Sequence, residues 1–159
     1  MEWKSAVAFT TPEGKFTAAK AITAFANRDP VNAARQCAGE AYLVVGVSTD
    51  GVLDGVPVYD NASLEGMLKT YVDGLHWDAD YVDFDGKRVL VITVAPPLPG
   101  DRIHSLVKEY AKHRSGTVFL RGVSRSEPAT HRELNDLQDR LRKKPPVSDV
   151  DAFTQAIDS

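Results

Sequence analysis

Apolar side chains recur every three or four residues in two long stretches of the chain, and this spacing places them on one face of a helix. Residues 15–27 show the pattern together with several good helix formers. Pro30 ends this helix, because proline disfavours the helical conformation of the residue before it. Residues 61–73 follow the helical spacing more closely, with Asn61 as the expected N-cap and Gly74 as the expected end.

Two further helices are expected in the second half of the chain. Thr130 and Glu133 form a capping box, in which each side chain satisfies a backbone amide of the other residue, ahead of a helix with leucine on one face. That helix ends before Pro145, which cannot continue it. A weaker apolar pattern over residues 103–113 predicts a helix that ends at Gly116.

Short apolar or alternating runs, bounded by turn residues, predict strands. These runs cover residues 2–8, 41–47, 80–84, 88–94 and 117–120. The second and fourth runs are almost wholly apolar, which is typical of central strands covered on both faces. Asp85-Gly86 is the expected turn of a hairpin. The irregular alternation of helices and hairpins favours an α+β fold, in which helices pack on a mixed, largely antiparallel sheet.

Length and composition are those of one globular domain. The chain has 159 residues, of which 43% are hydrophobic and 26% charged, a balance that permits a buried core. No apolar run approaches the roughly 20 residues that cross a bilayer, and residues 1–8 lack the apolar core of a signal peptide. The single cysteine, Cys37, excludes an internal disulfide and suits a reducing compartment. We therefore expect a cytoplasmic protein that does not associate with a membrane.

Charge is distributed unevenly along the chain, although the net charge is only −3. Residues 1–100 hold 8 Lys and Arg against 13 Asp and Glu, whereas residues 101–144 hold 11 against 6. Residues 145–159 add three Asp and no base, and we interpret them as an acidic C-terminal tail. Either the fold places a basic face beside a group of carboxylates, or these charges are ordinary solvated surface.

The familiar catalytic signatures are missing from the sequence. It contains no Walker A loop, no G-x-G-x-x-G, no G-x-S-x-G, no H-E-x-x-H and no paired C-x-x-C. The four histidines are spaced irregularly on different expected elements, so a zinc site is not expected. Cys37 has no acid–base partner nearby in the sequence, and we interpret it as incidental.

A series of short motifs spread along the chain is more informative. In order, they are Glu2-Trp3-Lys4, Ile22 to Asn27 (I-T-A-F-A-N), Tyr42 to Val47 (Y-L-V-V-G-V), Asp50-Gly51, Val89 to Val94, Val118 to Arg121 (V-F-L-R) and Pro128-Ala129-Thr130. This order resembles the AlbA_2 domain, also called the Schlafen-type domain, over roughly residues 2–142. The resemblance implies an α+β nucleic-acid-binding domain over residues 1–144, of a kind found in transcription-regulator-like or defence-associated proteins.

The resemblance also implies a catalytic hypothesis. Schlafen-type ribonucleases are similar in using two Glu and one Asp to hold a divalent cation, Mg²⁺ or Mn²⁺. Glu2 matches the second Glu, Lys4 follows it in the motif, and Asp50 is the acid nearest to the expected Asp. The first Glu has no counterpart in the sequence, and the family's Gly-Gly before the central strand is replaced by Glu40-Ala41. Two carboxylates hold a hydrated cation less well than three.

Basic residues in the second half of the chain supply the candidate nucleic-acid contacts, because Lys and Arg bind phosphates without reading the base sequence. The candidates are Arg121, Arg125, Arg114, Lys108 and Lys112, with Arg132, Arg140, Arg142, Lys143 and Lys144 on the closing helix. Arg121 is the preferred candidate, since the end of a strand fixes its side chain. The cations at 140–144 also complement the dipole at the end of their helix, which is a sufficient structural reason for them.

Asn27 and three aromatic residues each have two interpretations. Asn27 either contacts a backbone phosphate or caps the C-terminus of its helix. Trp3, Trp77 and Tyr81 either stack on bases or belong to the core.

Three functions follow as hypotheses. The leading one is a DNA- or RNA-binding module that grips the phosphate backbone, acting alone, as a homo-oligomer or with a separate effector protein. The first alternative is a metal-dependent endoribonuclease that uses Glu2, Lys4 and Asp50. The second alternative is a protein-interaction subunit of a regulatory or defence complex, which docks through its acidic residues.

Overall fold

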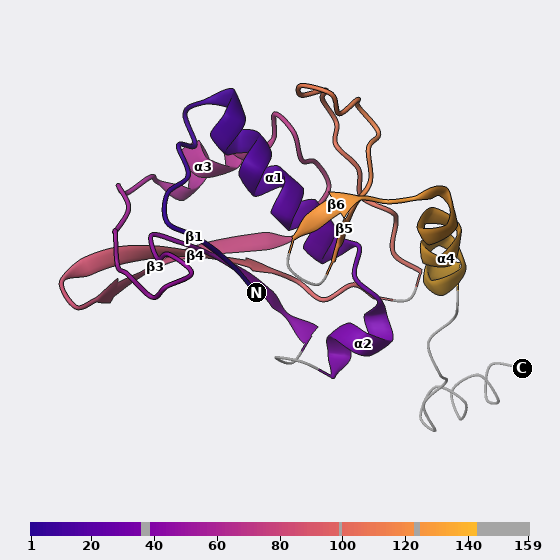
Figure 1. Ribbon diagram of the computed structural model, residues 1–159, viewed down its shortest axis with the longest axis horizontal. Coiled ribbons are helices and arrows are strands. Elements are labelled where there is room, and N and C mark those ends of the chain that lie inside the picture. The colour runs from indigo at the N-terminus through magenta and orange to yellow at the C-terminus, as the bar shows by residue number, and fades with distance from the viewer. Residues whose placement is uncertain (36–38, 99, 123–124, 143–159) are drawn as a thin grey trace, which may run out of the picture.

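The computed structural model describes residues 1–35, 39–98, 100–122 and 125–142 (Figure 1). Cys37, Lys143, Lys144 and the expected tail at 145–159 lie outside these ranges. The strands are β1 (Glu2–Lys4), β2 (Ala41–Val45), β3 (Trp77–Phe84), β4 (Lys87–Val94), β5 (Phe119–Arg121) and β6 (Ser126–Pro128). The helices are α1 (Pro12–Ala26), α2 (Pro30–Ala34), α3 (Asn61–Leu68) and α4 (His131–Arg142).

Four of the strands form one sheet in the order β1-β2-β4-β3, and β5 and β6 form a separate hairpin. β1 runs parallel to β2, whereas the other pairs are antiparallel. The predicted α+β fold with a mixed, largely antiparallel sheet is therefore confirmed. Glu2 aligns with Leu43 on the face that packs against α1, and Trp3 aligns with Val44 on the opposite face.

Helix α1 is the central element of the core. It begins at Pro12 because the Thr11 hydroxyl oxygen accepts a hydrogen bond from the Gly14 amide at 3.1 Å. Gly14 cannot carry a side chain here, since a Cβ would overlap the Ala8 carbonyl oxygen. Most of the helix is buried, and Figure 1 shows it lying over the sheet with α3 and the β5–β6 hairpin on the same side.

The capping box predicted for the last helix is confirmed. Thr130 Oγ1 accepts from the Glu133 amide at 3.2 Å, and Glu133 Oε1 accepts from the Thr130 amide at 3.4 Å. Helix α4 therefore begins at His131, and its Leu137 is buried.

The helix predicted over residues 103–113 is wrong, because this segment is an irregular loop. Leu106 is buried as its apolar character requires, but its backbone bonds outside the segment: its carbonyl accepts from the Gly116 amide at 2.7 Å. Tyr110 and His113 pair across a tight turn. Three apolar residues at helical spacing do not distinguish a helix from a loop that is pinned to the core.

The helix predicted over residues 61–73 is shorter than its apolar pattern. Asp60, not Asn61, is the N-cap, and the helix ends at Leu68. Tyr71 and Val72 are nevertheless buried, from the turn that follows. The turn therefore buries the same apolar side chains that a continued helix would bury.

The two central strands have a helix across one face only, within the part of the chain that the structure describes. On the opposite face Val44, Val47 and Val89 bury one another together with flanking apolar side chains. Trp3 is 42% exposed on that face. The expectation that these strands are covered on both faces is thus met by α1 on one side and in part by Val47 and Leu53 on the other.

Candidate nucleic-acid interface

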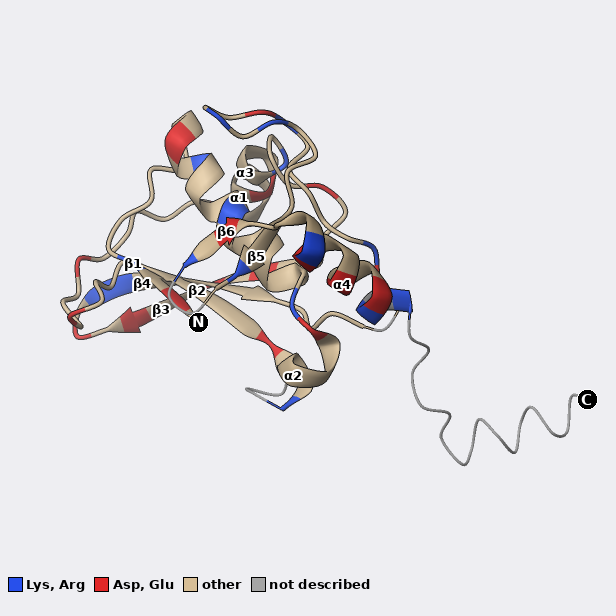
Figure 2. Cartoon of the chain, turned by 45° about the vertical axis from the view of Figure 1, so that its right-hand side comes forward, with Lys and Arg blue, Asp and Glu red and all other residues tan. Residues whose placement is uncertain are grey.

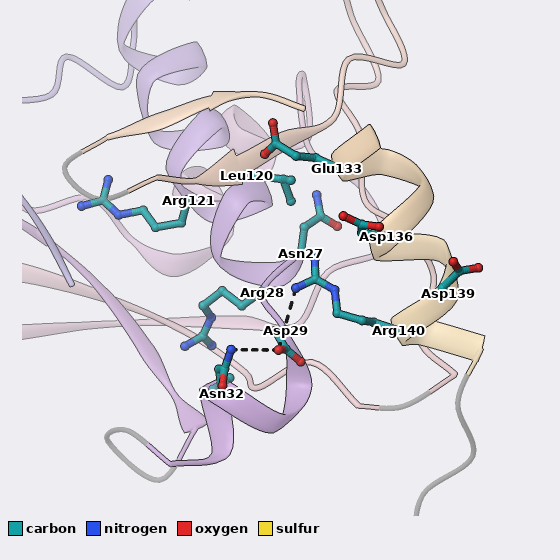
Figure 3. Close-up of a pocket in the computed structure, with 11 residues that line it drawn as sticks. Asn27, Arg28, Asp29, Asn32, Leu120, Arg121, Glu133, Asp136, Asp139 and Arg140 are labelled. Atoms are coloured by element: carbon teal, nitrogen blue, oxygen red, sulfur yellow. Dashed lines mark hydrogen bonds and ion pairs between the residues drawn. The ribbon is translucent and has the colours of Figure 1, made fainter. Parts of the chain in front are cut away.

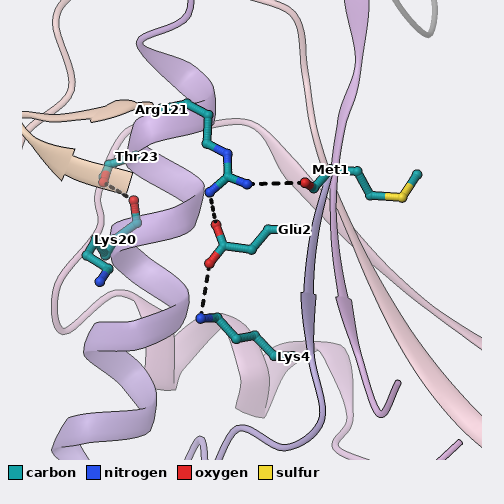
Figure 4. Close-up of polar contacts among 6 residues, drawn as sticks. All are labelled: Met1, Glu2, Lys4, Lys20, Thr23 and Arg121. Carbon is teal, nitrogen blue, oxygen red and sulfur yellow. Dashed lines mark hydrogen bonds and ion pairs between the residues drawn. The ribbon is translucent and has the colours of Figure 1, made fainter. Parts of the chain in front are cut away.

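A buried carboxylate lies between two cations on the first strand (Figure 4). Glu2 is only 9% exposed. Its Oε2 accepts a hydrogen bond from Arg121 Nη1 at 2.9 Å, and its Oε1 lies 3.2 Å from Lys4 Nζ. Arg121 Nη2 also donates to the Met1 carbonyl at 3.4 Å. Both oxygens of Glu2 therefore have cationic partners.

Arg121 is oriented toward the interior by the hairpin and by its partners. It aligns with Ser126 across the β5–β6 pair, and its guanidinium carbon lies 5.9 Å from the centre of the Phe25 ring. The Arg121 side chain is 19% exposed. Its contact with a phosphate stays a prediction, whereas its contact with Glu2 is part of the structure.

Asp50 lies in an exposed turn beyond the end of β2. Glu2 aligns with Leu43 of β2, which ends at Val45. Asp50 lies in the turn between Val47 and Leu53, which form an isolated bridge. Among the described residues there is no group of three or more His, Cys, Asp or Glu that could hold a metal ion. The three-carboxylate site of Schlafen-type ribonucleases is therefore not assembled among the described residues, and a Mg²⁺ or Mn²⁺ site at Glu2 and Asp50 stays a prediction.

Asn27 joins three segments at the end of α1. Its Nδ2 donates to the His104 carbonyl at 2.7 Å and to the Phe119 carbonyl at 3.1 Å, while its Oδ1 accepts from the His104 amide at 2.9 Å. Asn27 is also the C-cap of α1, so this interpretation is confirmed. Burial lowers the pKa of His104, with the charge of Asp101 acting in the opposite direction. The loop and β5 are thus both tied to α1 through one buried amide.

The loop between β4 and β5 presents cations to solvent. Its Lys108, Lys112 and Arg114 are exposed, and none of them forms an ion pair with a described residue. Lys112 occupies a two-residue turn with Ala111, whose φ of 51° lies in the left-handed region that disfavours a residue with a side chain. Such strain persists only where the surrounding structure enforces the turn.

Aromatic stacking enforces that turn. The His113 ring stacks on Phe16 of α1 with 5.4 Å between ring centres, and the Tyr110 ring stacks on the same Phe16 at 4.5 Å. Lys20 Nζ lies 6.0 Å from the centre of the Phe16 ring. Burial lowers the pKa of His113, and the charges of Lys112 and Lys20 lower it further. Lys20 of α1 therefore adds to the positive potential of the loop.

We call Lys20, Lys108, Lys112 and Arg114 the basic loop surface. Figure 2 shows blue segments with a red one beside them on the loop at the top of the molecule, and mixed colours on α4. Arg125 is exposed but pairs with Glu127 at 2.6 Å, and Arg140 lies 3.8 Å from Asp29. The cations on the hairpin and the last helix are thus partly neutralised by neighbouring acids.

A cavity of about 760 Å³ lies between the end of α1, α2, β5 and α4 (Figure 3). Its charged lining mixes both signs. The acids are Asp29, Glu133, Asp136 and Asp139, and the bases are Arg28, Arg121 and Arg140. Sequence reasoning does not anticipate this cavity, because its lining comes from segments that are up to about a hundred residues apart.

The family model described as Schlafen, AlbA_2 matches residues 1–130. The chain belongs to this family. The match includes all six strands, the Glu2–Arg121 pair and the basic loop surface of this Schlafen AlbA_2 domain.

The fold of the AlbA_2 domain is also similar to that of a solved protein. A crystal structure of the DIP2311 protein from Corynebacterium diphtheriae matches with a TM-score of 0.63 and 17% sequence identity. The match covers 92% of this chain and 25% of that one, so the chain spans about a quarter of the solved protein. A comparison with curated proteins finds no match. No helix in the described ranges combines the length and apolar character that a membrane crossing requires.

Lys20 is the residue of the basic loop surface that sequence reasoning misses. It lies in the middle of a helix of small and apolar residues, where the sequence pattern indicates only a lysine on the solvent-exposed side of the helix. Only the stacking of the loop on Phe16 brings it close to Lys112 and His113.

Proposed function

We propose that this AlbA_2 domain binds nucleic acid by its phosphate backbone, and that the basic loop surface makes the contacts. The observation that carries the proposal is a group of exposed cations that form no ion pair with a described residue. These cations, Lys108, Lys112 and Arg114, lie on the loop whose strained turn packs on α1. Lysine and arginine side chains of this kind bind phosphate oxygens through charge, with little dependence on base sequence. Family membership supports a role related to nucleic acids.

In this proposal Arg121 and Asn27 position the surface. Arg121 holds the β5–β6 hairpin to β1 through Glu2, and Asn27 holds the start of the loop and β5 to α1. Arg125 lies exposed on the hairpin and supplies a weaker contact, since Glu127 competes for its guanidinium group. The phosphate contacts of Arg121 and Asn27 stay predictions, since the polar groups of both side chains already have partners within the chain.

The geometry favours binding over cleavage. A metal ion at Glu2 would compete with Arg121 and Lys4, which contact its two oxygens, and Asp50 lies on a separate turn. We therefore derive no cleavage step from Glu2, Lys4 and Asp50. Cleavage of an oligonucleotide that requires Mn²⁺ and is lost in Glu2→Gln would restore the nuclease hypothesis.

The test is fluorescence anisotropy with labelled single- and double-stranded DNA and RNA, with and without Mn²⁺, followed by a denaturing gel. The double variant Lys108→Gln with Lys112→Gln should weaken binding about tenfold, from about 0.7 kcal/mol for each exposed contact. Arg35→Gln with Lys69→Gln is the control, because it removes the same charge from exposed positions just after α2 and α3. Equal weakening in both double variants would show that net charge, not this surface, determines binding.

A further inference from the structure

The face of the sheet opposite α1, which we call the open face, carries apolar side chains on all four strands. The strand registers place its side chains in rows across all four strands. Its members are Trp3, Tyr42, Val44, Val89, Val91, Val82 and Phe84, with Asp78 and Asp80 along the outer strand. Figure 1 shows the helix α1 and the helix α3 on the other side of the sheet.

Large apolar side chains of the open face are exposed at both of its edges. Trp3 on β1 is 42% exposed, and on β3 Val82 is 48% and Phe84 is 59% exposed. Between these edges Val91 is half-buried, and Val44 and Val89 are buried in a cluster with Val47. Large exposed apolar side chains that gather on one face mark an interaction site more often than single scattered ones do.

Carboxylates accompany the apolar side chains along the outer strand. Asp80 aligns with Val91 and Asp78 with Thr93, so both side chains lie on the open face. Both are exposed, and neither forms an ion pair with a described residue. At the hairpin end of the same face, Lys87 donates to the Leu53 carbonyl at 2.8 Å.

We propose that the open face binds a protein partner through a segment that combines basic and large apolar side chains. Basic groups would pair with Asp78 and Asp80, while apolar groups would cover the exposed side chains of Trp3, Val82 and Phe84. The charge argues against other occupants. Nucleic acid carries the same sign as these carboxylates, and so do residues 145–159, which hold three Asp and no Lys or Arg.

A second copy of the chain is also disfavoured, because it would bring the same acidic residues together.

The outer edge of β3 adds a second element of recognition. β3 is a terminal strand of the sheet and runs for eight residues, which is long enough for an extended partner segment to lie along it. In Figure 2 β3 with its red segments lies at the lower left, and the loop that carries blue segments lies at the top. The partner and nucleic acid would therefore occupy different sides of the domain, and this proposal does not rest on the proposed function.

The test uses the full chain and a defined probe. An isotope-labelled sample is titrated with a nine-residue peptide of alternating Lys and Leu, and with the same peptide carrying Glu in place of Lys. We expect chemical-shift changes at the amides of β3 and β4 and at the Trp3 indole with the Lys peptide only. Asp78→Asn with Asp80→Asn should weaken binding by about fivefold or more, within the range for two exposed charge pairs. Asp136→Asn with Asp139→Asn, which removes equal charge from α4, should leave it unchanged.

Three results would overturn the proposal. One is an absence of binding by the Lys peptide to a folded chain, as shown by dispersed amide signals. Another is a set of shift changes centred on α4 or the cavity instead of β3 and β4. The third is equal weakening by the two double variants, which would show that the peptide responds to net charge alone.

Discussion

The ion pair between Glu2 and Arg121 provides the most informative perturbation of the fold. Loss of one partner from a fully buried pair costs about 3–5 kcal/mol, and a hydrogen bond to a charged group contributes about 1.5–3 kcal/mol. Glu2 is 9% exposed and the Arg121 side chain 19%, and Lys4 remains 3.2 Å from Glu2 when Arg121 is replaced. Partial exposure and this second cation reduce the penalty. We therefore expect Arg121→Gln to lower the free energy of unfolding by about 2–3 kcal/mol.

The assay is urea denaturation followed by tryptophan fluorescence for Glu2→Gln, Arg121→Gln and the double variant. The two substitutions remove the same contact, so the double variant should be less destabilised than the sum of the single ones, by about 1–2 kcal/mol. Arg125→Gln is the matched control, because Arg125 pairs with Glu127 at 2.6 Å on the same hairpin but in solvent. It should cost no more than about 1 kcal/mol.

Two results would refute this reasoning. A loss for Arg121→Gln no larger than that for Arg125→Gln would show that the Glu2 contact does not hold the hairpin to β1. A folded Arg121→Gln protein of nearly unchanged stability that loses nucleic-acid binding would show that Arg121 contacts phosphate, as the sequence alone predicts.

Further predictions concern the loop and the strand hairpin. Asn27→Ala leaves three backbone groups without their partner and should lower the free energy of unfolding by about 2–4 kcal/mol in urea. Ala111→Gly relieves the strain of a residue with φ of 51° and should raise the free energy of unfolding by up to about 1 kcal/mol. A lowered urea midpoint would contradict this. Burial and two nearby lysines lower the pKa of His113. Bound phosphates should raise this pKa, so an NMR titration with oligonucleotide should give a higher pKa than one without it. A hydrogen bond from Arg88 lowers the pKa of Asp83 below 3.8, so the contribution of the ionised Asp83 to stability is lost as pH falls through that lowered pKa. In Arg88→Gln, the midpoint of the Asp83 titration measured by NMR should therefore rise.

Local sequence patterns predict the elements whose formation depends on neighbouring residues. The capping box of Thr130 and Glu133 and the turn at Asp85-Gly86 are of this kind, and both are confirmed. The order of short motifs, including Glu2-Trp3-Lys4, also predicts the family, which the match over residues 1–130 confirms. These features require no knowledge of distant contacts.

The loop over residues 103–113 shows where this reasoning fails. Leu106 and Tyr110 have helical spacing, but their partners are Thr117 and Phe16, which a local pattern does not reveal. The partner of Arg121 lies 119 residues away at Glu2, so the sequence identifies the arginine without its ion pair. Proximity between distant segments, not residue type, decides these roles.

The salt dependence of nucleic-acid binding tests the central claim most directly. The logarithm of the association constant is measured against the logarithm of salt concentration for the wild-type chain and for Lys108→Gln with Lys112→Gln. If both lysines contact phosphates, the slope should become shallower by about 1.4 on single strands and about 1.8 on duplex DNA. An unchanged slope in the double variant, or no binding at low salt by the wild-type chain, would contradict the account.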